Sequence, residues 1–332
     1  MDTHIKLDMK NKRILRELVN DGRAPYSKVA KKVGLSKEVV HYRVNNLIKQ
    51  GLLIGVNTVF NIKKIGMQIY FVHVRLKNVD SKNEDIIINS LVNHPNIAWV
   101  VKCIGNYDLI LKFFVKDNTE LNSVLKNLEK KYPYFNDFIT DFTVQEHPIP
   151  IPYLYTPLNA YPIKKRNNKQ VKIDELDLQI MELLSMDARK QFSELSSILK
   201  IPRDTIKYRI KRLENKGVIV TYRPSAWAGT KSLGYSWYLL MLKFKQLDRK
   251  TNKILMTYLS EHINVAYIYE LIGEHDLGFE IRLKTGDELN LILMRIKEIL
   301  RSDFKSQELS LILKEYKYTY YTPSLKDIIQ GV

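Results

Sequence analysis

From residue 7 to residue 51 the chain reads LDMKNKRILRELVNDGRAPYSKVAKKVGLSKEVVHYRVNNLIKQG, and from residue 173 to residue 217 it reads IDELDLQIMELLSMDARKQFSELSSILKIPRDTIKYRIKRLENKG. The two stretches align at an offset of 166 residues. A repeat with a period of more than 150 residues indicates that a whole domain pair is duplicated, whereas the units of a solenoid are much shorter. The alignment preserves Ile14 with Ile180, Leu18 with Leu184, Asp21 with Asp187, Arg23 with Arg189, Tyr42-Arg43 with Tyr208-Arg209, Leu47 with Leu213, and Gly51 with Gly217.

Each copy has the pattern of three short helices around one small core. Asp8 is placed to cap the first helix, and Gly34 supplies a backbone position that tolerates positive φ before the third helix, expected at about Ser36 to Lys49. A glycine turn between the second and third helices predicts a helix-turn-helix. The apolar residues after Gly51 and Gly217 predict strands, which we expect to form a small β wing in each unit.

The third helix of each copy is the expected recognition helix. Three apolar residues in each copy, at helical spacing, predict a buried stripe. The other faces carry polar, aromatic and cationic side chains, which fit a DNA major groove. The alternative for any one of them is a solvated helix face, and an ion pair to a neighbouring helix is an equal alternative for the two arginines nearest the stripe, Arg43 and Arg209. The candidate DNA-binding residues are Lys37, Glu38, His41, Tyr42, Arg43, Asn45, Arg203, Asp204, Lys207, Tyr208, Arg209 and Lys211.

The charge is concentrated on the two repeated units. Residues 1–60 hold twelve basic and five acidic residues, and residues 164–223 hold fifteen and eight, so each carries +7 of the total of +17. Charge added only for solubility would spread evenly. Localised basic charge is typical of proteins that bind a polyanion, which favours double-stranded DNA as the partner.

A different pattern follows each helical unit. In the first copy we expect strands at 69–76, 97–104, 109–115 and 138–144, with helices at 83–93 and 119–131. This βαββαβ order is the ferredoxin-like arrangement, and it returns after Gly234. The predicted fold class is therefore α+β, with two winged helix-turn-helix domains alternating with two ferredoxin-like domains.

The chain resembles two tandem copies of the Lrp/AsnC family of prokaryotic transcription regulators. The resemblance lies in the opening segment (Leu7–Leu15, Ile173–Met181), the Leu-Ser-x-x-x-Val-x-x-Arg helix (Leu35–Arg43) and the Gly-x-Tyr-Asp-Leu turn (Gly105–Leu109). It implies DNA binding, dimerisation through the ferredoxin-like domain, and regulation by an amino acid or related small molecule. The implied effector-binding residues are Gly105, Tyr107, Asp108, Gly273, His275 and Asp276.

Two features qualify the resemblance. The second recognition helix has Pro202 in place of the serine. Because proline has no hydroxyl to cap the helix, the second recognition helix could start differently from the first. The alternative for Asp108 and Asp276 is that they only cap a β turn.

A proline-rich and then basic segment joins the halves. We expect domains at 1–60 and 61–157, a linker at 158–172, and domains at 173–225 and 226–332. The basic run 164–169 is either a solvated linker or a phosphate contact. The joined halves should pair inside one chain as a pseudo-dimer, and further self-association is open.

Nothing in the sequence predicts catalysis, a cofactor or a metal site. The seven histidines have no zinc-like spacing, and the single cysteine, Cys103, should be buried and inert. Two rival functions remain: an enzyme similar to the siroheme decarboxylases, which pair two Lrp-like subunits, and an architectural DNA-binding protein. Because there is no secretory pattern or long apolar stretch, we expect a cytoplasmic protein with no membrane partner.

Overall fold

The computed structural model describes residues 7–149, 169–225 and 233–330. Most of the expected linker, 158–172, lies outside these residues. The elements in chain order are α1 (Met9–Asn20), α2 (Tyr26–Val33), α3 (Lys37–Lys49), β1 (Gly55–Phe60), η1 (Ile62–Ile65), β2 (Gln68–Leu76), α4 (Ser81–Val92), β3 (Ile97–Ile104), β4 (Leu109–Val115), α5 (Asn118–Lys131), β5 (Phe135–Pro148), α6 (Glu175–Met186), α7 (Phe192–Leu199), α8 (Arg203–Asn215), β6 (Ile219–Ser225), β7 (Ser236–Phe244), α9 (Arg249–Glu261), β8 (Val265–Gly273), β9 (Leu277–Leu283), α10 (Gly286–Leu300), η4 (Arg301–Asp303), β10 (Phe304–Tyr318), η5 (Pro323–Lys326) and α11 (Asp327–Gln330).

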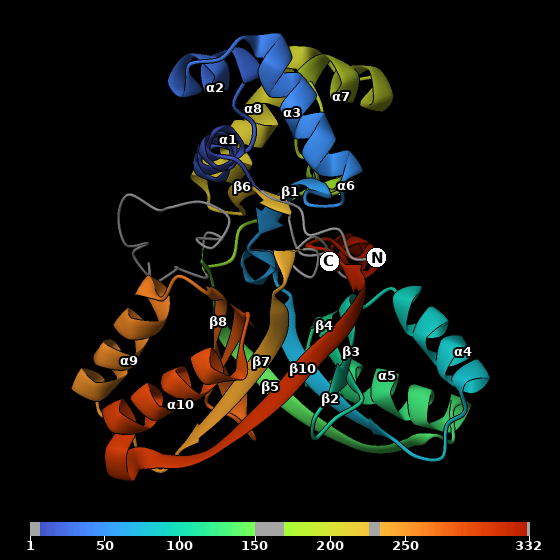
Figure 1. The fold of residues 1–332 in the computed structure, drawn as a ribbon. Helices are drawn as coiled ribbons and strands as arrows, with labels where there is room; N and C mark the ends of the chain where they lie inside the picture. The colour runs from blue at the N-terminus through green and yellow to red at the C-terminus, as the bar shows by residue number, and fades with distance from the viewer. Residues whose placement is uncertain (1–6, 150–168, 226–232, 331–332) are drawn as a thin grey trace.

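Two three-helix heads lie side by side at one end of the molecule (Figure 1). The first is α1–α3 and the second is α6–α8. Asp8 caps α1 as expected, accepting a hydrogen bond from the Asn11 amide, and Gly34 adopts the left-handed conformation. The two recognition helices begin at equivalent positions but are capped differently: Ser36 accepts the Val39 amide at the start of α3, whereas Pro202 gives α8 no side-chain cap.

The expected β wing of each head is wrong. Each head contributes one strand, and β1 and β6 pair with each other as a two-stranded antiparallel ribbon. The ribbon is exchanged between the heads, because α1 packs on β6 and α6 packs on β1. Thr58 of β1 strengthens the second contact by donating its hydroxyl to the Leu184 carbonyl at 2.8 Å. The strand expected directly after Gly51 is not formed, because Leu52 and Leu53 pack into the core of the first head and β1 begins at Gly55. The strand expected after Gly217 is present as β6. The sequence pattern contains no information on which strand pairs with which.

The ferredoxin-like order is confirmed in both halves, and the two sheets join into one closed barrel. Its strand order is β10-β3-β4-β2-β5-β8-β9-β7, with β7 returning to β10. Two pairs, β5 with β8 and β10 with β3, connect the halves. Helices α4 and α5 cover one half and α9 and α10 the other (Figure 1). The chain thereby forms its pseudo-dimer internally, and each sheet loses both of its open edges.

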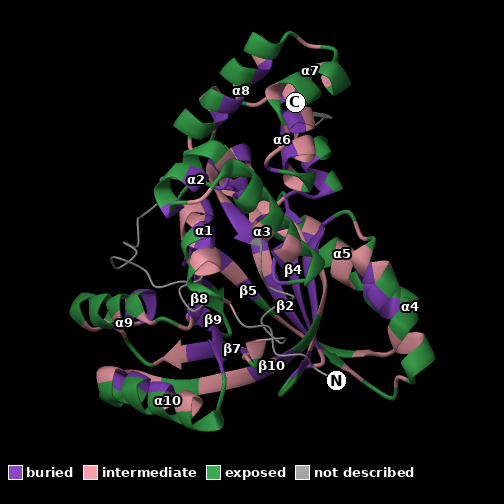
Figure 2. Cartoon of the chain, turned by 45° about the horizontal axis from the view of Figure 1, so that its top comes forward, coloured by how far each residue is buried: buried purple, intermediate pink, exposed green. Residues whose placement is uncertain are grey.

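Burial follows this plan. The strands are mostly buried, and the outer faces of the helices are exposed (Figure 2). One apolar cluster fills the barrel, and one lies under the helices of each half. No helix in the described parts of the chain has the length and apolar character needed to cross a membrane.

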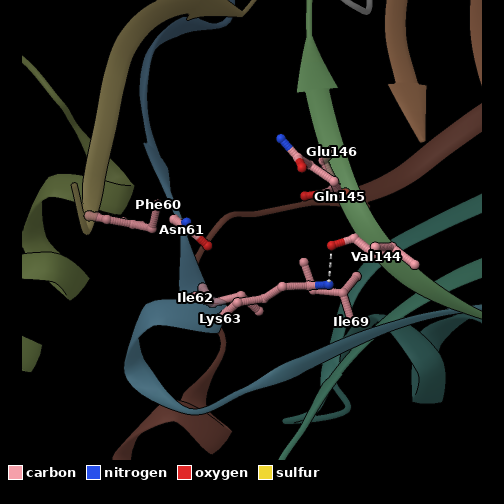
Figure 3. Close-up of a pocket in the computed structure, with 8 residues that line it drawn as sticks. All are labelled: Phe60, Asn61, Ile62, Lys63, Ile69, Val144, Gln145 and Glu146. Atoms are coloured by element: carbon pink, nitrogen blue, oxygen red, sulfur yellow. Dashed lines mark hydrogen bonds between the residues drawn. The ribbon is translucent and has the colours of Figure 1, made fainter. Parts of the chain in front are cut away.

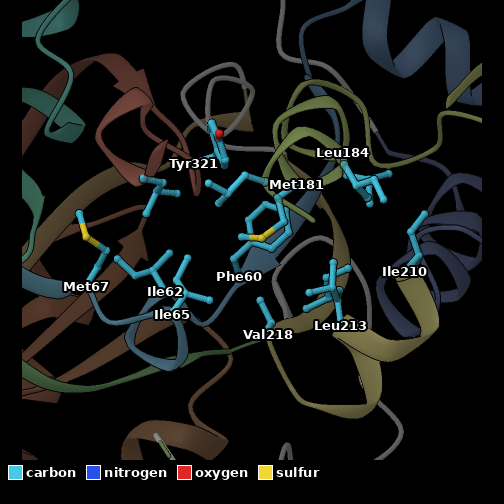
Figure 4. Close-up of a cluster of buried hydrophobic side chains, with 14 of the residues drawn as sticks. Phe60, Ile62, Ile65, Met67, Met181, Leu184, Ile210, Leu213, Val218 and Tyr321 are labelled. Atoms are coloured by element: carbon cyan, nitrogen blue, oxygen red, sulfur yellow. The ribbon is translucent and has the colours of Figure 1, made fainter. Parts of the chain in front are cut away.

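The heads differ in how they join the barrel. The core of the second head continues through Phe60, Ile62 and Met67 to the C-terminal Tyr321 and Leu325 (Figure 4). The buried core of the first head consists of residues between 14 and 53, with Leu233 packed against it. Among the described residues, the core of the second head is therefore continuous with the apolar residues of η1, the start of β2 and η5.

Candidate nucleic-acid interface and barrel interior

The two recognition helices present the expected faces to solvent. Their apolar stripes, Val40, Val44 and Leu47 in α3 and their counterparts in α8, are buried. Tyr42 and Tyr208 are 65% and 66% exposed although they are large aromatic residues, so packing does not account for them. The other candidate residues that lie exposed on these helices are Lys37, Glu38, His41, Asn45, Arg203, Asp204, Lys207 and Lys211.

Arg43 and Arg209 occupy a different position. Arg43 donates to Asp8 at 2.6 Å and to Asn11 at 3.0 Å. Arg209 donates to Asp174, and it also reaches the fully buried Asp177 at 3.3 Å. Each arginine thus ties its recognition helix to the start of the first helix in its own head. Of the two alternatives that the sequence left open for them, the geometry is that of the ion pair.

A reciprocal contact holds the heads together. Arg23 donates to the carbonyls of Ala188, at 2.6 Å, and Lys190, at 3.1 Å. Arg189 donates to the equivalent carbonyls of Gly22 and Ala24. The sequence repeat contains this arginine pair, but no role could be assigned to it from the sequence. The one sequence signal for this contact was that arginine occurs at the same position in both copies, although it does not belong to the shared apolar pattern.

Aromatic rings support each arginine. The Arg23 guanidinium lies 5.1 Å from the ring of Phe192, and Arg189 lies 4.2 Å from the ring of Tyr26, which is the equivalent position. Guanidinium stacking on an aromatic face contributes about 0.5–1 kcal/mol at exposed sites. The two heads are thus joined by equivalent contacts from each side.

In both Gly-x-x-Asp turns, the carboxylate and the glycine contact neighbouring strands of the protein. Asp108 accepts the Leu76 amide at 2.7 Å, and Asp276 accepts the Phe244 amide at 2.8 Å and Lys243 at 3.1 Å. A Cβ at Gly105 would collide with the Leu309 carbonyl of the neighbouring strand, and one at Gly273 would lie 2.6 Å from the Thr140 carbonyl. The two carboxylates thus bind amides of neighbouring strands rather than of their own turns, and the two glycines allow close strand packing. Their role as effector-binding residues stays a prediction.

Tyr107 and His275, the remaining predicted effector residues, point into the barrel. Both are buried, and His73 lies between them, with ring centroids 5.1 Å and 5.5 Å away. His275 Nδ1 lies 2.7 Å from Asp141 Oδ2, and His73 Nε2 lies 3.3 Å from the same oxygen. The sequence separates these residues too widely for any motif to reveal the group. The spacing of the histidines in the sequence, which is not zinc-like, therefore gave no sign of this group.

Burial and hydrogen bonding set the ionisation of this group. Burial lowers the pKa of His73, with Asp141 opposing the shift. Burial also acts to lower the pKa of His275, but its hydrogen bond to Asp141 outweighs this and raises it. Burial alone would raise the pKa of Asp141, yet the two histidines hold that pKa below its usual range.

The rest of the barrel interior is filled with aromatic and charged side chains. Lys112 binds Glu146 at 2.7 Å and lies 4.8 to 5.9 Å from four aromatic ring centroids. Arg282 is fully buried, 3.8 Å from the ring centroid of Trp237. Cys103 is buried as expected, and burial raises the pKa of its thiol to about 12, which makes it unreactive.

A small pocket lies where the end of β1 leads through η1 into the barrel (Figure 3). Its lining comes from η1, β2, β5 and the end of β1: Phe60, Asn61, Ile62, Lys63, Ile69, Val144, Gln145 and Glu146. Lys63 donates to the Thr143 and Val144 carbonyls, the latter at 2.9 Å. Burial lowers the pKa of Lys63 to about 8, with Glu146 opposing the shift.

Paired helix-turn-helix heads on a ferredoxin-like barrel define a class of protein, and three family models agree with it. An AsnC-type helix-turn-helix domain matches residues 7–48, a winged helix-turn-helix DNA-binding domain matches 173–220, and the Lrp/AsnC ligand binding domain matches 69–146. The HTH-type transcriptional regulator FL11 of Pyrococcus abyssi is 31% identical over 156 residues, which cover 46% of this chain and 98% of that protein. The regulator Ptr1 of Methanocaldococcus jannaschii is 31% identical over 124 residues, which cover 36% of this chain and 79% of Ptr1.

The chain belongs to the Lrp/AsnC family. Among solved structures, the siroheme decarboxylase NirDL in complex with an iron-uroporphyrin III analogue has a TM-score of 0.63 at 12% identity, with 97% of this chain and 96% of that chain covered. At this identity, the likeness shows that the whole two-headed fold is shared and no more. The regulators match about half of the chain, so a single half has the length of a complete relative.

Proposed function

We propose that this protein is a sequence-specific DNA-binding transcription regulator in which one chain supplies both recognition helices. The observation that carries the proposal is the pairing of two exposed, basic recognition faces by the Arg23 and Arg189 contacts. A fixed pair of such helices suits two half-sites about one helical turn, or a multiple of it, apart on one side of the duplex. Regulators of this family, including FL11, support the assignment.

The two faces differ, so we expect an imperfect palindrome. His41 is replaced by Lys207 and Asn45 by Lys211 in the second head. Selection of binding sites from a random duplex pool, followed by genome-wide occupancy mapping, tests this expectation. Two unequal half-sites at fixed spacing support the proposal. A single half-site, or uniform coverage in footprinting, contradicts it, and uniform coverage would favour an architectural role.

The proposal includes a small-molecule effector, because the family's ligand-binding model matches residues 69–146. With both turn carboxylates bound to strand amides, we propose that Lys63 binds the carboxylate of the effector in place of its backbone carbonyl partners. The pocket beside Lys63 has room for about one water molecule, so binding of an amino acid there requires the pocket to open. Calorimetry with individual amino acids on the wild-type protein and on Lys63→Gln tests this. Equal binding by both proteins would place the effector elsewhere.

The second candidate is a siroheme decarboxylase-like enzyme, which the whole-chain likeness to NirDL favours. A tetrapyrrole needs a wide cavity, whereas Lys112, Arg282 and their aromatic neighbours pack together inside this barrel. Absorbance spectra of the purified protein with and without added iron tetrapyrrole separate the two functions. A stoichiometric shift of the Soret band with loss of carboxyl groups as CO₂ would establish the enzyme.

A further inference from the structure

Inside the barrel, at the seam between its two halves, four groups that commonly bind metals lie together. His73 belongs to β2 and Asp141 to β5, both in the first half. His275 lies in the turn between β8 and β9, and Glu308 lies on β10, in the second half. One donor atom each from His73, Asp141 and His275 lies within 4.8 Å of the other two. All three side chains are at most 3% exposed.

Hydrogen bonds within the protein leave this group incompletely satisfied. His73 Nδ1 has no hydrogen-bond partner. His73 Nε2, 3.3 Å from Asp141 Oδ2, and His275 Nε2, 3.4 Å from Glu308 Oε2, have only long contacts with carboxylates. Buried polar atoms without partners cost about 1–3 kcal/mol each. The Asp141 carboxylate is fully buried and Glu308 is 24% exposed, and a cation would neutralise the buried carboxylate. A metal ion would give the two imidazoles and the buried carboxylate a common partner in place of these long contacts.

We propose that His73, Asp141 and His275 bind one divalent transition-metal ion of the zinc class. Two imidazole nitrogens and a carboxylate oxygen form a ligand set that Zn²⁺ accepts, with a fourth position left for a water molecule. Donor atoms around a tetrahedral ion, each ~2.0–2.1 Å from the metal, lie roughly 3.3 Å apart. The separation of His73 Nε2 from Asp141 Oδ2 is already 3.3 Å, and His275 Nδ1, at 2.7 Å from that oxygen, would move away by roughly half an ångström as its proton leaves.

The surroundings fit this assignment. His275 Nε2 lies 3.4 Å from Glu308 Oε2, so Glu308 can orient the ring from its outer nitrogen, as carboxylates do at many histidine metal ligands. The His275 amide fixes the second oxygen of Asp141 at 2.9 Å. Because the ligands come from both halves of the barrel, the ion would cross-link them and stabilise the barrel.

Metal titration of the full-length protein after treatment with a chelator tests the proposal. We expect one Zn²⁺ per chain by calorimetry and elemental analysis, together with a rise in the thermal midpoint. Co²⁺ should give the visible absorption of a tetrahedral site with nitrogen and oxygen ligands. Absence of stoichiometric Zn²⁺ binding, or an octahedral Co²⁺ spectrum, would overturn the proposal without recourse to any variant.

Two variants and a control locate the ion. His73→Gln and Asp141→Asn keep the approximate size of each side chain and should weaken Zn²⁺ binding at least tenfold, with circular dichroism in chelator confirming that they fold. His147→Gln is the control, because His147 is also buried and pairs with a carboxylate, Glu270, at 2.6 Å. It should bind Zn²⁺ as the wild type does. Wild-type affinity in the folded Asp141→Asn protein would contradict the assignment.

Discussion

Arg23 and Arg189 each donate hydrogen bonds to the loop that carries the other. The two residues are equivalent in the internal repeat, and their acceptors, Gly22 and Ala24 for one and Ala188 and Lys190 for the other, are equivalent as well. The contact is therefore symmetric, and it joins the loops that precede α2 and α7. It belongs to neither head alone, so it acts only when both heads are present.

Replacing Arg23 or Arg189 by alanine should loosen this pairing. Each change removes two hydrogen bonds, worth about 1 kcal/mol apiece, and the stacking of a guanidinium on an aromatic ring. We expect weaker binding to the complete site and a lower penalty when the spacing between half-sites is changed, as measured by fluorescence anisotropy. Arg13→Ala, which removes the same charge from an exposed position on α1, is the control. Unchanged spacing preference in both variants would show that the ribbon alone sets the geometry.

Charge on the recognition faces should control DNA affinity. Lys37→Ala with His41→Ala, or Arg203→Ala with Lys207→Ala, should each weaken binding, by about 1–3 kcal/mol for each side chain that hydrogen-bonds to a base. Wild-type affinity should also fall steeply between ~50 and ~200 mM salt. The double variant Arg249→Ala with Lys253→Ala, on the exposed face of α9, should bind normally. Salt-independent binding would argue against phosphate contacts.

The second head carries a strained turn that the first avoids. Lys200 has a φ of 56°, at the position where the first head has Gly34 with a φ of 67°. Because a side chain in this left-handed region costs roughly 1–2 kcal/mol, Lys200→Gly should stabilise the protein by about 1 kcal/mol in urea unfolding. Gly34→Ala should destabilise it by a similar amount. A destabilising Lys200→Gly would mean that the lysine side chain compensates for its backbone.

Gly105 and Gly273 should tolerate no larger residue. Their φ values are 148° and 153°, and a methyl group at either one meets backbone atoms of a strand from the opposite half. We expect Gly105→Ala and Gly273→Ala to cost about 3 kcal/mol or more, well above the cost of Gly34→Ala, which has open space around it. Equilibrium unfolding measures the difference. Equal losses of stability for all three variants would show that the strands joining the barrel halves can shift to accommodate a methyl group.

Glu315 should make stability depend on pH. Burial raises its pKa from an ordinary 4.5 to about 7, with the hydrogen bond from Trp99 opposing the shift. The folded state thus favours the protonated acid, so this contribution is complete below about pH 4.5 and is lost as the pH rises through about 7. Glu315→Gln keeps an acceptor for Trp99 and should gain stability over the wild type by on the order of 3 kcal/mol above that pH. A pH-independent difference between the two proteins would contradict this.

Local patterns in the sequence determined most of the elements. The helical spacing of Val40, Val44 and Leu47, the cap at Asp8 and the left-handed Gly34 depend only on neighbouring residues, and all appear as expected. The βαββαβ order and the exposed recognition faces follow from the same short-range periodicities. The internal repeat added what a single copy could not, namely that two such units form a pair.

Only the tertiary structure decided how the two copies meet. The exchange of β1 and β6, the closed barrel, and the convergence of His73, Asp141 and His275 all join residues from distant parts of the chain. The turn carboxylates Asp108 and Asp276, interpreted from the sequence as ligand contacts, proved to bind strand amides. A strand's alternation specifies which face is buried, but backbone hydrogen bonds are the same for every partner strand. Pairing between the copies is therefore set by the packing of whole domains, which no local pattern encodes.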